Sequence, residues 1–150
     1  MKLAIGCDHG GLELKNKIVK HLVDEGHEVI DCGTYSTDSV HYPVFAFDVA
    51  NKVKNKLVDK GIVVCTSGEG VMMCANKVKG VRCGMGYCDE VSRLMVEHNN
   101  ANVIAFGQKF MDAEDCLRRV DIFLNAEFQH GRHQLRLDLI EEAEKENFKN

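Results

Sequence analysis

The segment Cys65-Thr66-Ser67-Gly68-Glu69-Gly70, here named the Cys65 loop, joins a thiol to closely spaced glycines directly after an apolar run. Alternate glycines let the backbone approach a ligand closely, and amides that open a following helix can donate to an oxyanion or a phosphate. A thiol beside such amides is stabilised as a thiolate, which makes Cys65 a candidate base or nucleophile. The same glycines also suit a plain strand-to-helix connection, so the loop alone leaves both interpretations open.

Asp8 and His9 follow the first apolar run of the chain. They could act as general acid and base, hold a metal, or cap the helix that begins near Gly10. The metal interpretation has little support, because no second acidic residue stands beside them and no pair of histidines has His-x-x-x-His spacing. We therefore expect no metal site here.

Arg132 and Arg136 lie one helical turn apart and share one face of a predicted helix. With His9 and Lys109 they could form a compact cationic site for a dianionic phosphate. The chain has 19 Lys and Arg residues against 23 Asp and Glu, a formal net charge of −4. Any bound anion therefore requires such a local cluster. The arginines could equally be solvated partners of the acidic C-terminal segment.

The charge balance and the scattered basic residues predict neither nucleic-acid binding nor attraction to a membrane surface. No apolar run approaches the roughly 20 residues that span a bilayer, and the polar start of the chain does not resemble a signal peptide. The seven cysteines include no Cys-x-x-Cys pair, which predicts free thiols in a reducing compartment. We therefore expect a cytoplasmic protein without zinc or dithiol redox chemistry.

Apolar runs alternate with helix-like segments, and these elements must position the reactive residues. Buried strands are predicted at residues 3–7, 29–32, 61–65, 81–84 and 102–106, from short apolar or β-branched runs. Helices are predicted from the 14–23 apolar stripe up to Gly26, and at 43–59, from 71, 89–97, 113–124 and 134–145. Five buried strands separated by helices predict one α/β domain over residues 1–150, a three-layer α/β/α Rossmann-like sandwich with a five-stranded parallel sheet.

Ligands of an open parallel sheet bind beyond the carboxyl ends of its strands. This rule predicts that Asp8, the Cys65 loop and Lys109 meet at one edge, together with His98 and Asn99 between the last two strands. Taken alone, His98 is also typical of a helix C-terminal cap. The extra C-terminal helix follows the last strand, and its pattern suits docking on a partner subunit as well as packing on its own domain.

These pieces in this order resemble the type B ribose-5-phosphate isomerase and galactose-6-phosphate isomerase family. The similarity covers nearly the whole chain and, besides the Cys65 loop, includes the motifs Gly6-Cys7-Asp8-His9-Gly10-Gly11, Asp31-Cys32-Gly33-Thr34, Tyr42-Pro43, Ala75-Asn76-Lys77-Val78-Lys79-Gly80-Val81-Arg82, His98-Asn99-Asn100-Ala101-Asn102-Val103 and Gly131-Arg132-His133. The resemblance implies an aldose–ketose isomerase of sugar phosphates that needs no metal or cofactor. It also implies a homodimer, or a tetramer built from dimers, with the active site at the subunit interface.

By this resemblance Cys65 is the base that moves a proton between C1 and C2 through an enediolate. Ser67 and the amides of residues 68–70 would stabilise the developing oxyanion. Asp8 and His98 would open the sugar ring, with His98 as the proton donor. His9, Arg132 and Arg136 resemble phosphate ligands, and Asn99 is similar to a residue that holds the reacting oxygens. The other expected substrate-binding residues are Tyr42, Thr66, Gly68, Glu69, Gly70 and Lys109.

Three departures from the family pattern concern the substrate more than the reaction. They are Thr66, Ser67 and Glu69 in place of Gly, Thr and an apolar residue, Lys109 in place of Arg, and His41 and Val44 where many ribose-specific members have acidic residues. We expect conversion of ribose 5-phosphate to ribulose 5-phosphate, with galactose 6-phosphate or allose 6-phosphate as alternatives. Glu69 also offers a second candidate base, because a carboxylate can perform this proton transfer.

Asp8 and Lys109 also match the layout of a phosphoacceptor receiver domain, a non-enzymatic signalling module. That function requires an aspartate at the end of the third strand, where this chain has Cys65. A flavin or nucleotide binder is a third alternative. The chain has no Trp, and no aromatic pair flanks the Cys65 loop, so this alternative has little support.

Overall fold

The computed structural model describes residues 1–148, and within them five parallel strands form one sheet in the order β2-β1-β3-β5-β4. The strands are β1 (Lys2–Cys7), β2 (Glu28–Asp31), β3 (Lys60–Cys65), β4 (Cys83–Met85) and β5 (Val103–Gly107). Cys7 of β1 pairs with Val64 of β3, and Cys65 pairs with Gly107 of β5. The carboxyl ends of the three central strands therefore meet at one edge of the sheet.

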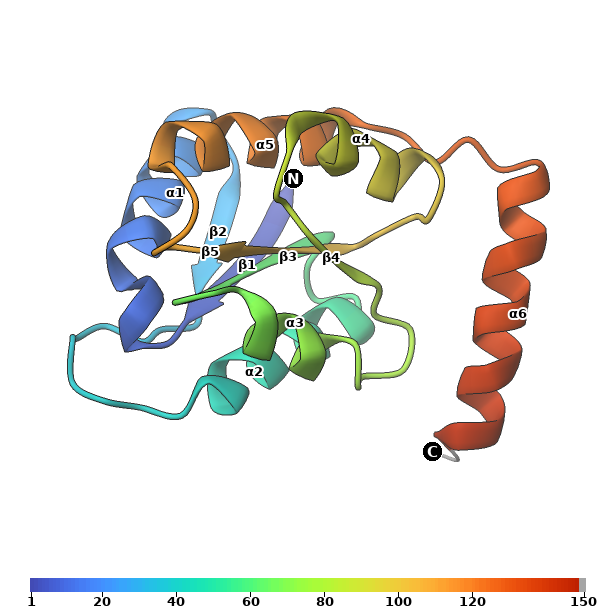
Figure 1. Ribbon diagram of the computed structural model, residues 1–150, viewed down its shortest axis with the longest axis horizontal. Helices are drawn as coiled ribbons and strands as arrows, with labels where there is room; N and C mark the ends of the chain where they lie inside the picture. The colour runs from blue at the N-terminus through green and yellow to red at the C-terminus, as the bar shows by residue number, and fades with distance from the viewer. Residues whose placement is uncertain (149–150) are drawn as a thin grey trace.

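The α-helices in this range are α1 (Leu12–Asp24), α2 (Tyr42–Lys54), α3 (Glu69–Ala75), α4 (Asp89–Glu97), α5 (Ala113–Asn125) and α6 (Arg132–Asn147). Helices α1, α4 and α5 cover one face of the sheet, and α2 and α3 cover the other (Figure 1). Alternate residues of β3 pack into the two hydrophobic cores on either side of the sheet. Ile62 and Val64 pack against the layer of α1, α4 and α5, and Val63 and Cys65 pack against the layer of α2 and α3. This is the three-layer sandwich expected from the sequence.

Helix α2 ends at Lys54, earlier than the predicted residue 59. The physical reason is a left-handed Lys56, with φ of 58°. Around it, the Leu57 N–H donates to the Lys52 carbonyl at 3.0 Å and the Lys56 N–H donates to the Val53 carbonyl at 3.1 Å. This pair of bonds is a Schellman ending, which a glycine usually marks in a sequence. The other boundaries lie within about two residues of their predicted positions.

Helix α6 stands apart from both layers, beside the β4 edge of the sheet (Figure 1). Of its described residues only His133 is buried. A second contact with its own domain is made by Glu144, whose Oε2 accepts the Gly80 N–H at 2.6 Å. The large apolar side chains that remain exposed on this helix are Leu135, Leu139 and Ile140. None of the helices in residues 1–148 is both long enough and apolar enough to cross a lipid bilayer.

Candidate active site

The Cys65 loop lies at the carboxyl edge of the sheet, between the end of β3 and the first turn of α3. The Cys65 side chain is buried, and its Sγ accepts the Gly68 N–H at 3.1 Å. Gly68 has a left-handed backbone with φ of 84°, and a Cβ there would lie 2.8 Å from Met85 Sδ and 2.9 Å from the Phe106 carbonyl carbon. Glycine is therefore required at this position, and its amide supplies a hydrogen-bond donor to the sulfur.

Asp8 follows β1 and lies beside the end of β3, where its N–H donates to the Val64 carbonyl at 3.3 Å. Its Oδ1 accepts the Gly10 N–H at 2.9 Å, and the residue is 7% exposed. Gly10 in turn lies directly against the Thr66 side chain, which leaves no room for a Cβ. Asp8 is thus the expected cap, and capping holds its carboxylate beside the Cys65 loop.

Three further expected residues reach the same edge. The Tyr42 ring, at the start of α2, packs against Gly70, where a Cβ would lie 2.6 Å from a ring carbon. Lys109 follows β5; its N–H donates to the backbone of the Cys65 loop at 3.1 Å, and its side chain is exposed. His9 is exposed, and its Nδ1 accepts the Val40 N–H at 3.2 Å. Residues from four separate segments of the chain therefore lie at the carboxyl edge of the sheet, around the Cys65 loop.

The other thiols differ from Cys65 in their surroundings. Burial raises the pKa of the thiols of Cys7, Cys32 and Cys116 to about 11, and burial also raises the pKa values of Cys74 and Cys83. These groups stay protonated near neutral pH. Cys88 Sγ accepts the Val91 N–H at 3.4 Å, but it follows the edge strand β4 rather than a central strand. Cys65 differs from these thiols because it combines two features: it lies at the end of a central strand, and its sulfur accepts a backbone N–H at 3.1 Å.

His98 and Asn99 lie at the opposite edge of the sheet, so the expectation that one chain brings them to the Cys65 loop is wrong. Helix α4 runs back from the carboxyl edge, and His98 is its C-cap residue, just before β5 begins. At that edge the Gly61 N–H, near the start of β3, donates to the Asn102 carbonyl at 2.9 Å. With a rise of about 3.3 Å per residue, β3 separates the two edges by about 16 Å.

His98 instead meets the start of α6. Its ring stacks on that of buried His133, with centroids 4.3 Å apart and planes inclined by 13°. Burial lowers the pKa of His133, and its interactions with His98, Arg132 and Arg136 lower it further. Both arginines are exposed. His98, Asn99, Arg132 and Arg136 therefore form a second group, here named the α6 group, at the amino edge of the sheet.

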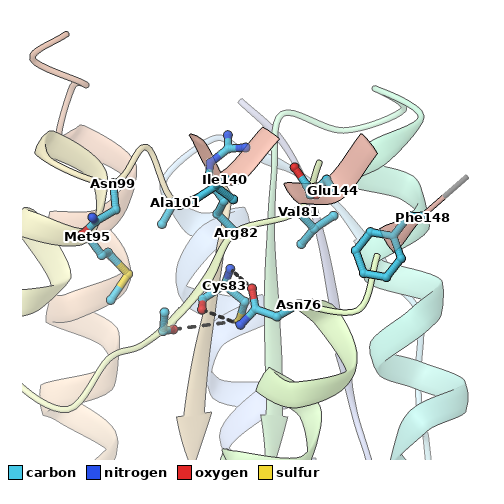
Figure 2. Close-up of a pocket in the computed structure, with 11 residues that line it drawn as sticks. Asn76, Val81, Arg82, Cys83, Met95, Asn99, Ala101, Ile140, Glu144 and Phe148 are labelled. Carbon is cyan, nitrogen blue, oxygen red and sulfur yellow. Dashed lines mark hydrogen bonds between the residues drawn. The ribbon is translucent and has the colours of Figure 1, made fainter. Parts of the chain in front are cut away.

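A cavity of about 340 Å³ lies between α6 and the β4 edge (Figure 2). Ile140, Glu144 and Phe148 line it from the C-terminal segment, and the residues opposite include Val81, Arg82, Met95 and Asn99. Asn76 braces this edge, since its side-chain amide bonds to the Cys83 N–H and carbonyl at 2.8 and 2.9 Å. No residue of the Cys65 loop lines the cavity.

Sequence patterns do not single out Lys15, although the motif Asp31-Cys32-Gly33-Thr34 contains its partner, Asp31. Lys15 is 1% exposed, and its Nζ donates to both carboxylate oxygens of Asp31. Lys15 stands three residues before Ile18 and seven before Leu22, on the buried stripe of α1. A lysine on an apolar stripe, together with an aspartate at the end of a strand, is the signal that could have indicated this pair.

Among the described residues, His21, Glu25 and Asp121 could reach one metal ion, and they lie outside the candidate site. His21 Nε2 is 2.8 Å from Glu25 Oε1 and 2.9 Å from Asp121 Oδ2. The hydrogen bond between the two carboxyl groups raises the pKa of Glu25. This cluster links the C-terminal parts of α1 and α5, so it belongs to the helical layer rather than to the carboxyl edge.

Comparisons with known proteins agree with one another. Residues 3–140 match the family described as Ribose/Galactose Isomerase. Ribose-5-phosphate isomerase B of Escherichia coli (strain K12) is 44% identical over 142 residues, 93% of each chain. The structure of Clostridium thermocellum ribose-5-phosphate isomerase B has a TM-score of 0.97 at 44% identity, covering 98% of this chain and 99% of that chain. A Mycoplasma genitalium ribose-5-phosphate isomerase B with bound ribulose-5-phosphate has a TM-score of 0.92 at 43% identity, covering 97% of both chains. This chain therefore belongs to the ribose/galactose isomerase family.

Proposed function

We propose that this protein interconverts ribose 5-phosphate and ribulose 5-phosphate, with Cys65 as the base. One observation carries the proposal: a buried thiol that accepts a backbone N–H at 3.1 Å lies at the end of a central strand, beside the Asp8 turn. The relatives above are named ribose-5-phosphate isomerase B, and one contains ribulose 5-phosphate. These names favour the five-carbon sugar over galactose 6-phosphate and allose 6-phosphate.

The reaction begins with opening of the furanose ring, because the C2 proton becomes acidic only beside a free aldehyde. Asp8 takes the proton of the C1 hydroxyl as the bond between C1 and O4 breaks. His98 of the partner subunit donates a proton to O4. The bond from Gly10 to Asp8 Oδ1 holds the carboxylate in place, as a positioned general base requires.

Proton transfer follows on the open chain. Cys65 removes the C2 proton, and the electron pair forms the C1–C2 double bond of an enediolate while O1 becomes an oxyanion. Amides of the Cys65 loop and the Ser67 hydroxyl donate to this oxygen, which stabilises the charge where it develops. The thiol then returns the proton to C1 while the O2 proton moves to O1, which leaves a hydroxyl on C1 and the ketone at C2.

The phosphate is held by side-chain N–H donors from both groups, because a net charge of −4 provides no general attraction for it. His9 belongs to the carboxyl edge, whereas Arg132 and Arg136 come from α6 of a second chain and can make charge-assisted bonds. Lys109 adds a point charge without bidentate geometry. The remaining substrate contacts are assigned to Tyr42, Thr66, Gly68, Glu69, Gly70 and Asn99.

The two groups meet if a second chain supplies one of them, and we therefore assign a homodimer with two shared sites. Exposed apolar side chains on α6 and the cavity of about 340 Å³ beside it support this assignment. Pairing of two such dimers would give a tetramer without changing the sites. The seven free thiols suit a reducing cytoplasm, where we place the enzyme.

The test is conversion of ribose 5-phosphate by the purified protein in D₂O, followed by NMR. We expect ribulose 5-phosphate with deuterium at C1, because the base exchanges its proton with solvent. Galactose 6-phosphate and allose 6-phosphate are assayed at equal concentration, and faster conversion of either would overturn the ribose assignment. Labelling by acetyl phosphate without any sugar turnover would instead favour the receiver-like alternative.

A further inference from the structure

Lys15 carries a charge, yet the fold encloses it in the first turn of α1. Its side chain is 1% exposed, and Nζ donates to Asp31 Oδ1 at 2.9 Å and to Asp31 Oδ2 at 2.8 Å. Burying an ammonium group is unfavourable unless an opposite charge and hydrogen bonds replace the lost water. An apolar side chain of similar length would fill the same volume without desolvating a charge. Packing alone therefore does not account for this pair.

Asp31 ends β2 and orders the segment that follows it. Its Oδ1 also accepts the Gly33 N–H at 2.9 Å, and its backbone carbonyl accepts the Tyr35 hydroxyl at 2.7 Å. The Tyr35 ring lies beside Lys15, with Nζ 5.0 Å from the ring centroid. The ion pair and its partners thus hold residues 31–35 together.

Residues 33–40, here named the strap, hold the residue that precedes Asp8. The Cys7 N–H donates to the Gly33 carbonyl at 2.7 Å, and the Thr34 N–H donates to the Cys7 carbonyl at 2.8 Å. Both backbone groups of Cys7 are therefore bonded to the strap. Any shift of Gly33 and Thr34 must move the start of the Asp8 turn.

The strap reaches the next residue of the site as well. It passes the first turn of α1 on its way to α2 (Figure 1). Near its end the Val40 N–H donates to His9 Nδ1 at 3.2 Å, which fixes the direction of the imidazole. Lys15 is thus connected to Asp8 and His9 through Asp31 and the strap.

We propose that Lys15 and Asp31 are positioning residues of the isomerase: through the strap they hold Asp8 for ring opening and His9 for phosphate binding. This inference rests on the proposed function. Neither residue touches the substrate. Loss of the ion pair releases residues 31–35 and lets the Asp8 carboxylate move, and a displacement of about 1 Å near reacting atoms lowers a rate about 10²-fold.

The two substrates separate this effect from a simple loss of folded protein. Ribose 5-phosphate is a closed furanose, so its conversion needs ring opening by Asp8. Ribulose 5-phosphate cannot form that ring, because the hydroxyl that would attack C2 carries the phosphate. Exchange of its C1 proton with solvent needs Cys65 but no ring opening. The ratio of ribose 5-phosphate turnover to ribulose 5-phosphate exchange therefore does not depend on the active fraction of the protein.

The experiment compares Lys15→Met with Lys20→Met, a matched change on the same helix at an exposed lysine paired with Asp24. Turnover and C1 exchange are measured by NMR in D₂O. Lys15→Met should lower the ratio about tenfold or more and raise KM for both substrates through His9. Lys20→Met should keep the wild-type ratio.

Asp31→Asn is the second variant, because it keeps an oxygen for the Gly33 N–H while it removes the charge. Asp31→Asn should also lower the ratio of ribose 5-phosphate turnover to ribulose 5-phosphate exchange. If Lys15→Met does not fold, this variant provides the test. A wild-type ratio, or an equal loss of both rates, would overturn the inference. Inactivity of the wild-type protein toward ribose 5-phosphate would contradict the proposed function itself, before any variant is compared.

Discussion

Two buried cysteines at neighbouring strand ends have different surroundings. Cys7 and Cys65 end neighbouring strands, and both are buried. Burial raises the pKa of Cys7 to about 11, and its Sγ has only a long contact, 4.0 Å, to the Thr34 carbonyl. Cys65 faces a donor, the Gly68 N–H at 3.1 Å. A backbone N–H that points at the sulfur is suited to a cysteine that acts as a base, because it stabilises the thiolate form.

Cys65→Ala should lower kcat for ribose 5-phosphate by about 10²–10⁴-fold and leave KM within a few-fold, because the base is lost while the binding groups remain. Cys116→Ala, which removes a buried thiol from α5, is the control and should keep the wild-type kcat. Steady-state kinetics measure both. Retained kcat in Cys65→Ala, together with a large loss in Glu69→Gln, would make the carboxylate the base.

At the scale of elements, the direction of the chain decides which residues can meet. In a parallel sheet each strand ends at the carboxyl edge, and each crossover helix returns the chain to the amino edge. Cys65 ends a strand and His98 ends a helix, so the two lie at opposite edges. The predicted helix at 89–97 already contained this information, because His98 follows its last residue. Grouping His98 with the strand ends overlooked that direction.

Gly68→Ala tests the turn that begins α3. Gly68 and Gly26 both have left-handed backbones, with φ of 84° and 90°, but a Cβ at Gly26 would meet no atom within 4 Å. Alanine at either position should lower the free energy of unfolding by about 1 kcal/mol. The loss should be larger at Gly68, because the added Cβ would contact Met85. Only Gly68→Ala should lower kcat, by about tenfold or more, since it moves the donor to Cys65. Urea unfolding and kinetics measure both variants; a fully active Gly68→Ala enzyme would contradict the role of this amide.

The contact at the start of α6 should weaken in acid. Burial lowers the pKa of His133 below its usual value of 6.5, so the undocked state binds the proton more tightly than the folded state. The stability from this contact is complete above pH 6.5 and declines as the pH falls toward the folded-state value. Hydrogen exchange at the start of α6, corrected for intrinsic rates, should therefore accelerate between about pH 7.5 and about pH 5.5. His133→Gln should lack this acceleration, and equal acceleration in both proteins would refute the assignment.

Local patterns predicted the fold class, the order of elements and the Cys65 loop, because apolar runs and glycine spacing act over a few residues. Features that depend on distant contacts were missed. The end of α2 depends on a left-handed Lys56, and the role of Lys15 depends on Asp31, sixteen residues away. The separation of α6 from its own domain was one of two open alternatives, since its sequence shows apolar residues but not what covers them.

At the scale of the whole molecule, two incomplete groups lie at opposite edges of one sheet. The interface of a twofold dimer uses the same surface of both chains, so α6 of each chain can reach the carboxyl edge of the other. Arg132 and Arg136 share α6 with the exposed Leu135, Leu139 and Ile140. Docking that buries the apolar side chains would therefore also deliver the two arginines that we propose as phosphate ligands. Both sites would be completed in one step of association.

Mixing two inactive variants tests this account most directly. Cys65→Ala removes the proposed base from the carboxyl edge, and His98→Ala removes the proposed ring-opening acid from the α6 group. A mixed dimer then holds one site with both changes and one site with neither. After subunit exchange, an equal mixture should recover about one quarter of wild-type turnover of ribose 5-phosphate, because about half of the dimers are mixed and each has one intact site. No recovery, in a mixture whose subunit exchange is verified by native mass spectrometry, would contradict the shared site and place both residues in one chain's own site.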